Sequence, residues 1–528
     1  MTERAFQGCL AAIAVLVIAG AGLDVMEVDA AQYAGMARDM VRRGDVLHLF
    51  YRDEPYLDKP PLLFWLSALS FKLFGVHNWS YRLPSILFAA MGLYSTYRFT
   101  LRYHGSEMAR RATLMLGCSA AFILMTNDVR CDTMLMGAVI TATWFGCAWI
   151  DDRRPIHAVL FAVAVALGML AKGPLGAMAP ALAMLCHLAH TRSWGTLRTS
   201  GMLLAAIVLA LALLPMCIGL YQQHGWHGLR FFFWEQSFGR LTGENRWKDD
   251  STVFYFTHEV LWQLLPWTVY VLVGCWHGLR ALLTRTPLAE VATLGGALLV
   301  FCALSLSQFK LPHYLFVIAP HLAILGAFGW KRVSGQVLRR VQSALLSLLG
   351  TALLFFTFTV FPEQRWPSLV PVICLLGVAA WLWRSFPDRE GAFAASFVVM
   401  FATGWVMNTY FYPNLLHFQA NAMAGKWAAE HKLDPDRFHG MQISGPALDF
   451  YAGHPVKWLS HAGEARAVLA PGVTIYTDAV HRTELIQAGL IPVREDRLWN
   501  HPAQRIGLPF LFPEQRQAIL EPRYLLHF

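Results

Sequence analysis

The chain has 528 residues, of which 56% are hydrophobic and only 15% are charged, and its mean hydropathy is +0.42. A soluble domain carries about 25% charged residues, so this composition excludes an ordinary soluble protein. The net charge is +9, but Lys and Arg fall between apolar runs, which favours membrane topology over nucleic-acid binding. The nine Cys residues show no metal-ligand spacing, which argues against both a cysteine zinc site and a disulfide framework.

Apolar runs near 20 residues recur along the chain, and this length crosses about 30 Å of hydrocarbon. The fold class is therefore predicted to be a polytopic α-helical membrane protein with about 13 membrane-spanning helices. No clean cleavage site follows the first run, so we expect an uncleaved helix rather than a signal peptide. The expected centres are Val15, Ala89, Gly117, Thr141, Val163, Ala181, Ala210, Tyr270, Leu298, Ile318, Ala352, Leu376 and Val399.

The short segments between these runs predict an orientation. One alternating set contains sixteen Lys or Arg residues and the other set contains four, and basic loops stay in the cytoplasm. We therefore expect the N-terminus inside and the C-terminus outside. The sixteen are Arg98, Arg102, Arg110, Arg111, Arg153, Arg154, Arg192, Arg198, Arg280, Arg285, Lys331, Arg332, Arg339, Arg340, Arg384 and Arg389; the four are Arg130, Lys172, Lys310 and Arg365.

Three longer segments then face outside, namely residues 24–79, 221–257 and 413–528. In the first, residues 29–43 have the pattern of an interfacial helix. Its apolar face is formed by Tyr33, Met36, Ala37 and Met40, and its charged residues are Arg38, Asp39, Arg42 and Arg43.

The tail differs in character from the rest of the chain. It alternates short apolar runs, predicted as strands at 441–444, 456–460 and 473–477, with predicted helices at 421–431 and 482–488. We expect a membrane domain over residues 1–412 and a small α/β domain over residues 413–528.

Two acidic residues, Glu27 and Asp29, open the predicted interfacial helix. In an extended segment both carboxylates would face one site, since side chains two residues apart point the same way. Asp29 could then act as a general base, orient an acceptor or bind a cation. Asp is also favoured at a helix N-cap, and these residues alone favour the cap.

Four basic residues lie at similar depth on the outer side: Lys59, Arg130, Lys172 and Lys310. Lys59 precedes Pro60-Pro61 and an apolar run, so it either neutralises a lipid phosphate or anchors a helix end. Arg130 either serves a site or forms a plain ion pair with Asp132. The two remaining Lys residues are also typical of polar turns, but four cations at one level favour a phosphate-bearing ligand.

A series of short motifs follows in order along most of residues 10–330. These motifs are Asp29-Ala-Ala-Gln-Tyr33, Gly44-Asp45, Asp58-Lys59-Pro60-Pro61, Phe74-Gly75, Arg82-Leu83-Pro84, Asp132, Lys172-Gly173-Pro174, Leu265-Pro266-Trp267 and Lys310-Leu311-Pro312-x-Tyr314. Taken in this order, they resemble the C-type (GT-C) glycosyltransferase superfamily. The branch most similar holds the bacterial lipid A aminoarabinose transferases and relatives of the protein O-mannosyltransferases.

The resemblance implies the GT-C fold in a bacterial inner membrane, with the site and the tail facing the periplasm. It implies inverting transfer of a sugar from a polyprenyl-phosphate donor to lipid A, another glycolipid or a protein. Asp29 and Asp132 are the expected catalytic acids, and Lys59 is the expected donor-phosphate ligand. The remaining expected substrate-binding residues are Glu27, Tyr33, Arg130, Lys172, Lys310 and Tyr314.

One departure concerns metal binding. The aminoarabinose transferases carry a zinc-binding Glu before the phosphate-binding Lys, where this chain has Asp58, and residues 245–251 contain no His to serve as its partner. A divalent metal at Asp58 is therefore left open, and no other cofactor is expected.

Other classes of protein are weighed against this interpretation. A transporter or lipid flippase would place its charges near the midplane, often in two related halves. Here the charges lie at the outer ends of the spans, and the sequence shows no two-fold repeat. A non-catalytic assembly or receptor protein would leave Asp29 and Lys59 without a role. The expected partners are a donor, an acceptor and membrane lipids, with no nucleic acid.

Overall fold

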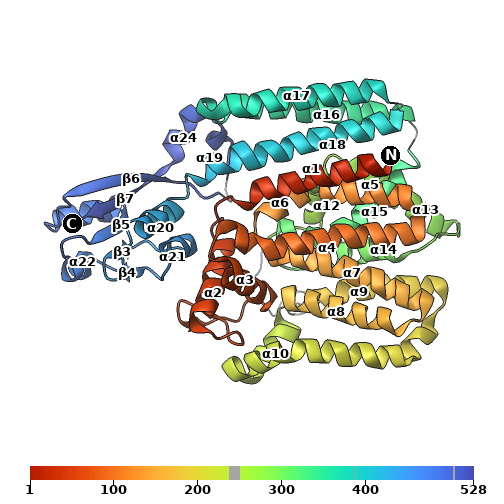
Figure 1. Cartoon of the computed structure of the whole chain (residues 1–528), viewed down its shortest axis with the longest axis horizontal. Coiled ribbons are helices and arrows are strands. Elements are labelled where there is room, and N and C mark those ends of the chain that lie inside the picture. Colours follow the sequence, from red (N-terminus) through yellow and green to blue (C-terminus); the bar gives the residue numbers. More distant parts are fainter. Residues whose placement is uncertain (237–238, 240–249, 334, 387, 504–505) are drawn as a thin grey trace.

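The computed structural model describes residues 1–236, 239, 250–333, 335–386, 388–503 and 506–528. Helices running roughly side by side form a long bundle, and a smaller α/β domain lies at one end of it (Figure 1). The main bundle helices are α1 Glu3–Ala21, α4 Asn78–His104, α5 Ser106–Gly117, α6 Ala120–Asn127, α7 Cys131–Asp152, α8 Pro155–Lys172, α9 Leu175–Thr191, α10 Ser200–Arg230, α12 Tyr255–Gln263, α13 Thr268–Leu283, α14 Ala292–Leu306, α15 Ala319–Trp330, α16 Gly335–Thr359, α17 Arg365–Ser385, α18 Asp388–Val406 and α19 Tyr412–Leu416. Short 3-10 or π-helical turns connect them: η1 Trp194–Arg198, η2 Phe231–Glu235, η3 Pro312–Ile318, η4 Pro362–Gln364 and η5 Met407–Phe411.

The helices confirm a polytopic helical fold. Among the described residues, eight helices are long and apolar enough to cross a membrane, and α5 with α6, which meet at a 53° bend, gives a ninth. Every span centre predicted from the sequence lies within a helix. The total of 13 stays a prediction, because it also counts α9, α13 and α14, which are short, and α4, which carries several charges.

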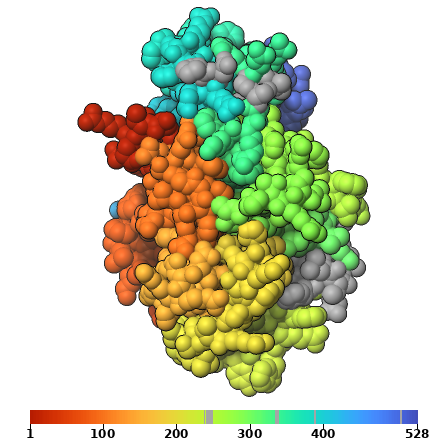
Figure 2. Space-filling view, turned by 90° about the vertical axis from the view of Figure 1, so that its right-hand side faces the viewer, coloured from red at the N-terminus to blue at the C-terminus, as the bar shows by residue number. Residues whose placement is uncertain are grey.

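The basic loops meet at the end of the bundle opposite the α/β domain. There Arg110 donates to the Met1 carbonyl at 2.8 Å, Arg102 pairs with Asp152 at 2.6 Å, and Arg153 donates to the Ser193 carbonyl at 3.4 Å. Figure 2 looks onto this end, where the segments coloured red to cyan lie side by side. The helix directions therefore separate the basic loops from the outer segments, as the sequence predicts.

The first outer segment contains helix α2 Asp29–Arg43, strands β1 Phe50–Tyr51 and β2 Glu54–Pro55, and helix α3 Leu62–Phe74. α2 has the predicted bounds and ends at Gly44, whose φ of 70° suits glycine. The predicted apolar face is buried. Arg38 was predicted on the charged face, yet it is also buried, because the C-terminal domain covers that side of the helix.

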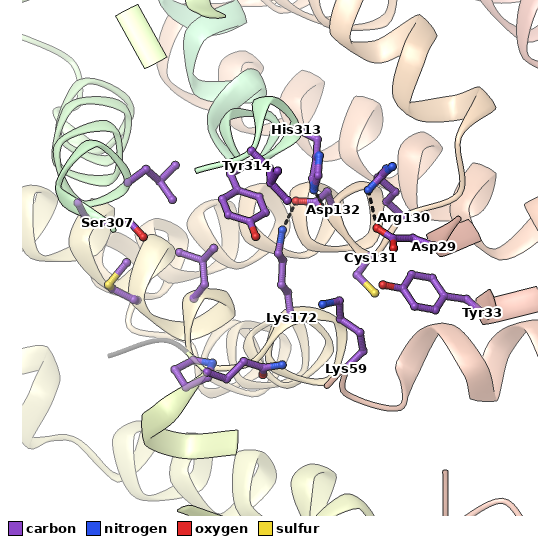
Figure 3. Close-up of a pocket in the computed structure, with 17 residues that line it drawn as sticks. Asp29, Tyr33, Lys59, Arg130, Cys131, Asp132, Lys172, Ser307, His313 and Tyr314 are labelled. Atoms are coloured by element: carbon purple, nitrogen blue, oxygen red, sulfur yellow. Dashed lines mark hydrogen bonds and ion pairs between the residues drawn. The ribbon is translucent and has the colours of Figure 1, made fainter. Parts of the chain in front are cut away.

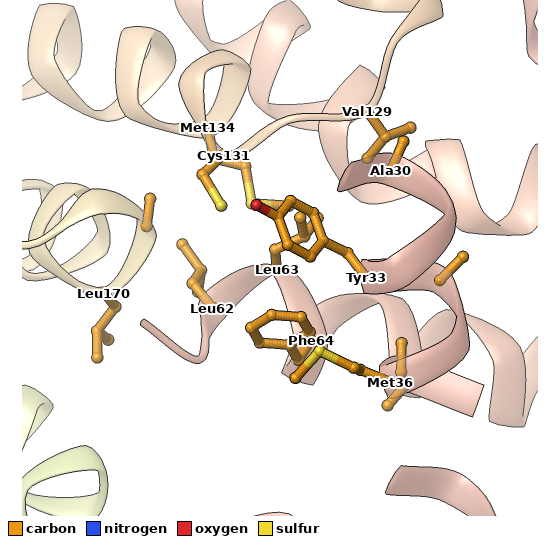
Figure 4. Close-up of a cluster of buried hydrophobic side chains, with 14 of the residues drawn as sticks. Ala30, Tyr33, Met36, Leu62, Leu63, Phe64, Val129, Cys131, Met134 and Leu170 are labelled. Atoms are coloured by element: carbon orange, nitrogen blue, oxygen red, sulfur yellow. The ribbon is translucent and has the colours of Figure 1, made fainter. Parts of the chain in front are cut away.

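A hydrophobic cluster packs α2 against α3 and the start of α7 (Figure 4). Tyr33 packs edge-to-face on Phe64 with ring centroids 5.6 Å apart, and Leu63, Cys131 and Met134 close the space around them. Edge-to-face aromatic pairs add about 0.5–1.5 kcal/mol to the free energy of burial. The cluster therefore holds the first residue of α2 close to the N-terminus of α7.

The C-terminal domain is built on a mixed five-stranded sheet of order β4-β3-β5-β7-β6. β3 is parallel to β4 and β5, and β7 is antiparallel to β5 and β6. The elements are α20 Ala420–Glu430, β3 Phe438–Met441, α21 Pro446–Ala452, β4 Lys457–Leu459, α22 Ala462–Val468, β5 Thr474–Asp478, α23 Ala479–Gln487, β6 Arg494–Asn500, η6 Leu508–Leu511, α24 Pro513–Ile519 and β7 Glu521–His527.

Most predicted tail elements lie within a few residues of observed ones. The strand predicted at 441–444 is wrong in position, because β3 ends at Met441 and Gln442 turns the chain with a φ of 54°. Strands β6 and β7 were not predicted, since their charged residues mask the alternation. The domain boundary at 413 stays a prediction; the last bundle helix continues through η5 into α19, and α20 is the first element after it.

Candidate active site

A cavity lies where the outer ends of the bundle helices meet the first outer segment (Figure 3). It has about 1050 Å³ of empty space, part of it open to solvent. One wall is ionic and another is apolar. The polar lining residues are Asp29, Tyr33, Lys59, Arg130, Cys131, Asp132, Lys172, Gln236, Ser307, His313 and Tyr314; the apolar ones are Pro174, Leu175, Met178, Ala303, Leu304 and Leu311.

Asp29 is the first residue of α2 and points into this cavity. The N-cap position is taken by Val28 and no side chain caps the helix, so the interpretation of Asp29 as a cap is wrong. Its carboxylate accepts a hydrogen bond from Arg130 Nη1 at 3.0 Å, and the side chain is 44% exposed. A partly exposed carboxylate held by one cation is available to a second ligand.

Arg130 lies between two acids, just before α7. Its Nε donates to Asp128 at 2.6 Å, and its Nη1 reaches Asp29. Arg130 therefore pairs with Asp128 and Asp29, whereas the plain ion-pair interpretation paired it with its near neighbour Asp132. Burial alone would lower the pKa of the guanidinium, but the two carboxylates raise it above its usual value.

Asp132 is buried in the first turn of α7 and pairs with Lys172 from the end of α8. The Lys172 ammonium also lies 3.9 Å from the centre of the Tyr314 ring, a cation–π contact. His313 Nε2 is 3.8 Å from the other Asp132 oxygen. Three elements that are far apart in the sequence thus converge on one buried carboxylate.

The turn between α8 and α9 presents Lys172 to the cavity. Gly173 has a φ of 72°, and Pro174 starts the next helix. The two helices then touch backbone to backbone at Gly168 and Gly176, where a Cβ on Gly176 would collide with the Gly168 carbonyl. Small residues allow such close approach between membrane helices.

Lys59 enters the cavity from the loop before α3. Its ammonium donates to Asp58 at 2.6 Å, and Pro61 occupies the N-cap of α3, so the two prolines fix the approach of the chain. Burial lowers the pKa of Lys59, but Asp58 more than offsets this and raises it overall. Lys59 therefore remains an ammonium at neutral pH.

The described residues do not fit a metal ion at Asp58. Its carboxylate is already bound by Lys59, and no group of three His, Cys, Asp or Glu side chains suited to a metal occurs within the described part of the chain. The stretch predicted to offer a partner ligand, 245–251, lies mostly outside the described residues. A metal at Asp58 stays a prediction, and no step is assigned to it.

Two predicted substrate-binding residues lie elsewhere. Glu27 does not face the same site as Asp29; it accepts hydrogen bonds from Asn421 at 2.9 and 3.1 Å in a second pocket. Its burial there raises the pKa of its carboxyl group. Lys310 is buried and donates to the carbonyl and hydroxyl oxygens of Ser251 at 3.2 and 3.3 Å, outside the lining of the cavity.

The structure also places residues in the site that sequence reasoning missed. His313 lies inside the Lys310–Tyr314 motif, so the motif itself was an available signal. Gln236, which follows η2, donates to the Asp58 carbonyl, and Ser307 follows α14; neither had a sequence signal.

Comparisons with known proteins agree with this architecture. The family model for dolichyl-phosphate-mannose-protein mannosyltransferases matches residues 58–218. Undecaprenyl phosphate-alpha-4-amino-4-deoxy-L-arabinose arabinosyl transferase from Pseudomonas aeruginosa (strain UCBPP-PA14) is 26% identical over 387 residues, which are 69% of this chain and 68% of the relative. The enzyme of that name from Edwardsiella ictaluri is 26% identical over 315 residues, 58% of this chain and 56% of the relative.

Solved structures show the same fold at lower identity. ArnT from Cupriavidus metallidurans bound to undecaprenyl phosphate has a TM-score of 0.76 at 20% identity, covering 99% of this chain and 98% of that chain. The oligosaccharyltransferase AglB from Archaeoglobus fulgidus has a TM-score of 0.50 at 12% identity, covering 90% and 70%.

The fold and these similarities define the chain as a polytopic membrane glycosyltransferase of the GT-C class. Within that class the chain is similar to the aminoarabinose transferases over 69% of its length at 26% identity, which agrees with the resemblance of its sequence motifs. The transporter and flippase alternative is therefore set aside.

Gly176→Ala tests how the α8–α9 turn places Lys172. The added methyl has no room against the Gly168 backbone, so the helices must separate. Overpacking of this kind costs about 1–3 kcal/mol. We expect a lower melting temperature for the purified protein in detergent, measured by thermal unfolding. Gly377→Ala in α17, where an added Cβ meets nothing within 4 Å, is the matched control. Equal melting temperatures for both variants would show that the close approach is not needed.

Proposed function

We propose that the chain transfers a sugar from undecaprenyl phosphate, or a related polyprenyl phosphate, to an acceptor at the periplasmic face of a bacterial inner membrane. The proposal is carried by one observation: Asp29 opens into a cavity whose walls bear Lys59, Arg130 and Lys172 beside an apolar surface from α9 and α14. Such a cavity suits a phosphate joined to a hydrocarbon chain. The activity named for the relatives and the undecaprenyl phosphate bound to ArnT support the same donor.

The reaction is a single in-line displacement. An acceptor hydroxyl or amine attacks the anomeric carbon, the bond from that carbon to the phosphate oxygen breaks, and its electron pair leaves with the phosphate. The leaving phosphate gains negative charge, which the cations stabilise. The acceptor proton goes to Asp29, and one displacement inverts the anomeric centre. A lipid phosphate leaves without protonation, so this scheme needs no general acid on that side.

The two predicted catalytic acids receive different roles. Asp29 is partly exposed, and within the described part of the chain its carboxylate is bound on its Arg130 side, so it can meet an acceptor. Asp132 is buried and engaged with Lys172 and His313, so it serves better to hold Lys172 in place than to take a proton. We therefore assign Asp29 as the base and Asp132 as a positioning residue.

The relatives indicate which acceptor to test first. Lipid A is the first acceptor to test, because the relatives are aminoarabinose transferases. Another glycolipid or a protein remains the alternative. The orientation is proposed from the basic loops, which gather at the end away from the cavity.

Asp29→Asn keeps the size of the side chain but removes the base. We expect the rate of transfer to fall by about 10²–10⁴-fold, the range for general-base catalysis. The measurement is transfer of aminoarabinose from undecaprenyl phosphate to lipid A in nanodiscs. Asp39→Asn, on the same helix but outside the cavity lining, is the control. A near wild-type rate for Asp29→Asn would remove the base from the mechanism.

Lys59→Ala tests the donor phosphate. Hydrogen bonds to charged groups contribute about 1.5–3 kcal/mol, so we expect the donor KM to rise and kcat to fall, with roughly a tenfold or greater loss in kcat/KM. Lys59→Gln should lose activity as Lys59→Ala does, and Lys59→Arg should keep part of the rate because it retains the charge. Lys72→Ala, an exposed lysine in the last turn of α3, is the control. If all three Lys59 variants match wild type, Lys59 only anchors the helix.

Reporter fusions test the orientation. Alkaline phosphatase is active only in the periplasm, so a fusion after Phe528 should be active and one at Arg339 inactive. The reverse pattern would place the cavity in the cytoplasm and overturn the proposed function.

A further inference from the structure

A second pocket, the interdomain pocket, lies between the first outer segment and the C-terminal domain. It has about 920 Å³ of empty space, part of it open to solvent. The first outer segment contributes Glu27 and Val28, and the C-terminal domain contributes the other walls. The residues that matter for its chemistry are Gln419, Asn421, Gln442, Ser444, Asn500 and Arg523.

The interdomain pocket occupies a characteristic place in the sheet. Gln442 and Ser444 follow directly after the carboxyl end of β3, and Arg523 pairs across from Asp478 at the carboxyl end of β5. β3 is parallel to both neighbours, and the chain passes from β3 to β4 on one side and then returns to β5 on the other. In open α/β sheets, ligands bind outside the carboxyl ends of strands where the direction of winding reverses.

Polar and apolar groups share the lining of the interdomain pocket, which has one acidic residue, Glu27, one basic residue, Arg523, and the imidazole of His501. Four of its side chains are amides, which both donate and accept hydrogen bonds. Arg523 already pairs with Glu521 at 2.8 Å and with Asp478 at 3.6 Å, and Glu27 already accepts from Asn421. Such a surface matches the hydroxyl and amide groups of an uncharged sugar better than a phosphate, which would need uncompensated cations.

The interdomain pocket adjoins the donor cavity through one short segment. Glu27 faces the pocket and Asp29 faces the cavity, and two residues of backbone span at most about 7 Å. The Glu27 backbone N–H donates to Gln419 at 2.7 Å, so the C-terminal domain holds this segment directly. A molecule seated in the pocket would therefore lie one short stretch of backbone away from Asp29, the proposed base.

We propose that the interdomain pocket binds an uncharged sugar unit of a glycolipid acceptor. This inference rests on the proposed function for its role in transfer. Its binding step can be measured without any turnover.

The test uses the full chain in nanodiscs and saturation-transfer NMR with N,N′-diacetylchitobiose, a neutral sugar bearing hydroxyl and amide groups. N-acetylglucosamine 1-phosphate is the charged comparison. Ser444→Tyr, at the exposed lip of the pocket, should reduce binding of the neutral sugar at least tenfold by filling it. Asn500→Ala is a milder second variant that removes one amide. Gln487→Tyr is the matched control, because Gln487 is an exposed residue of α23 outside the pocket lining. This variant should bind the neutral sugar as wild type does.

We expect the neutral sugar to bind wild type and Asp29→Asn alike, and the phosphorylated sugar to bind less well. Absence of binding, binding untouched by both pocket variants, or stronger binding of the phosphorylated sugar would each overturn the proposal. In transfer assays Ser444→Tyr should raise the acceptor KM and leave the donor KM unchanged. If wild type transfers no sugar from any polyprenyl phosphate, the proposed function fails, whereas loss of sugar binding alone rejects only the pocket.

Discussion

A charge at the boundary of a membrane must be neutralised, and this constraint organises the outer end of the bundle. Breaking a buried pair by removing one partner is costly, so each cation in the cavity holds its carboxylate firmly. Arg130 pairs with Asp29, which ties the start of α7 to α2, and Asp132 pairs with Lys172, which ties α7 to α8. Arg130 and Asp132 flank Cys131 in the sequence, and their side chains point in opposite directions. One turn of backbone therefore anchors both sides of the cavity.

Under the proposed function, the same pairs also prepare the site for a phosphate. Each pair holds its cation in one position and in its charged form. A donor phosphate would then meet ammonium and guanidinium groups that are already oriented, so little reorganisation would be required when charge develops on the leaving group. The structural interpretation of these ion pairs is therefore compatible with the catalytic one.

Sequence periodicity located the spans and α2 because both depend on local patterns of apolar residues. It placed Lys59, Arg130 and Lys172 at one level because each interrupts or borders an apolar run. It did not separate Glu27 from Asp29, since the direction of Glu27 is set by Asn421, almost 400 positions away. Arg38 was misplaced for the same reason, because the carbonyls that bind it, at 2.8 and 3.1 Å, belong to Asp449 and Phe450. Both errors therefore come from the docking of the C-terminal domain, which local sequence patterns do not encode.

That docking gives the C-terminal domain a part in the geometry of the site. Arg52 pairs with Asp449 at 2.7 Å, the Val25 N–H donates to the Tyr451 hydroxyl at 2.7 Å, and Lys426 pairs with Asp24 at 2.6 Å. These contacts lie on both sides of Asp29 along the chain, so the segment that carries it cannot shift without disturbing the domain. Because the same segment separates the two pockets, a shift of the domain would change the distance between them. The contacts of the C-terminal domain therefore help to fix the geometry of the cavity.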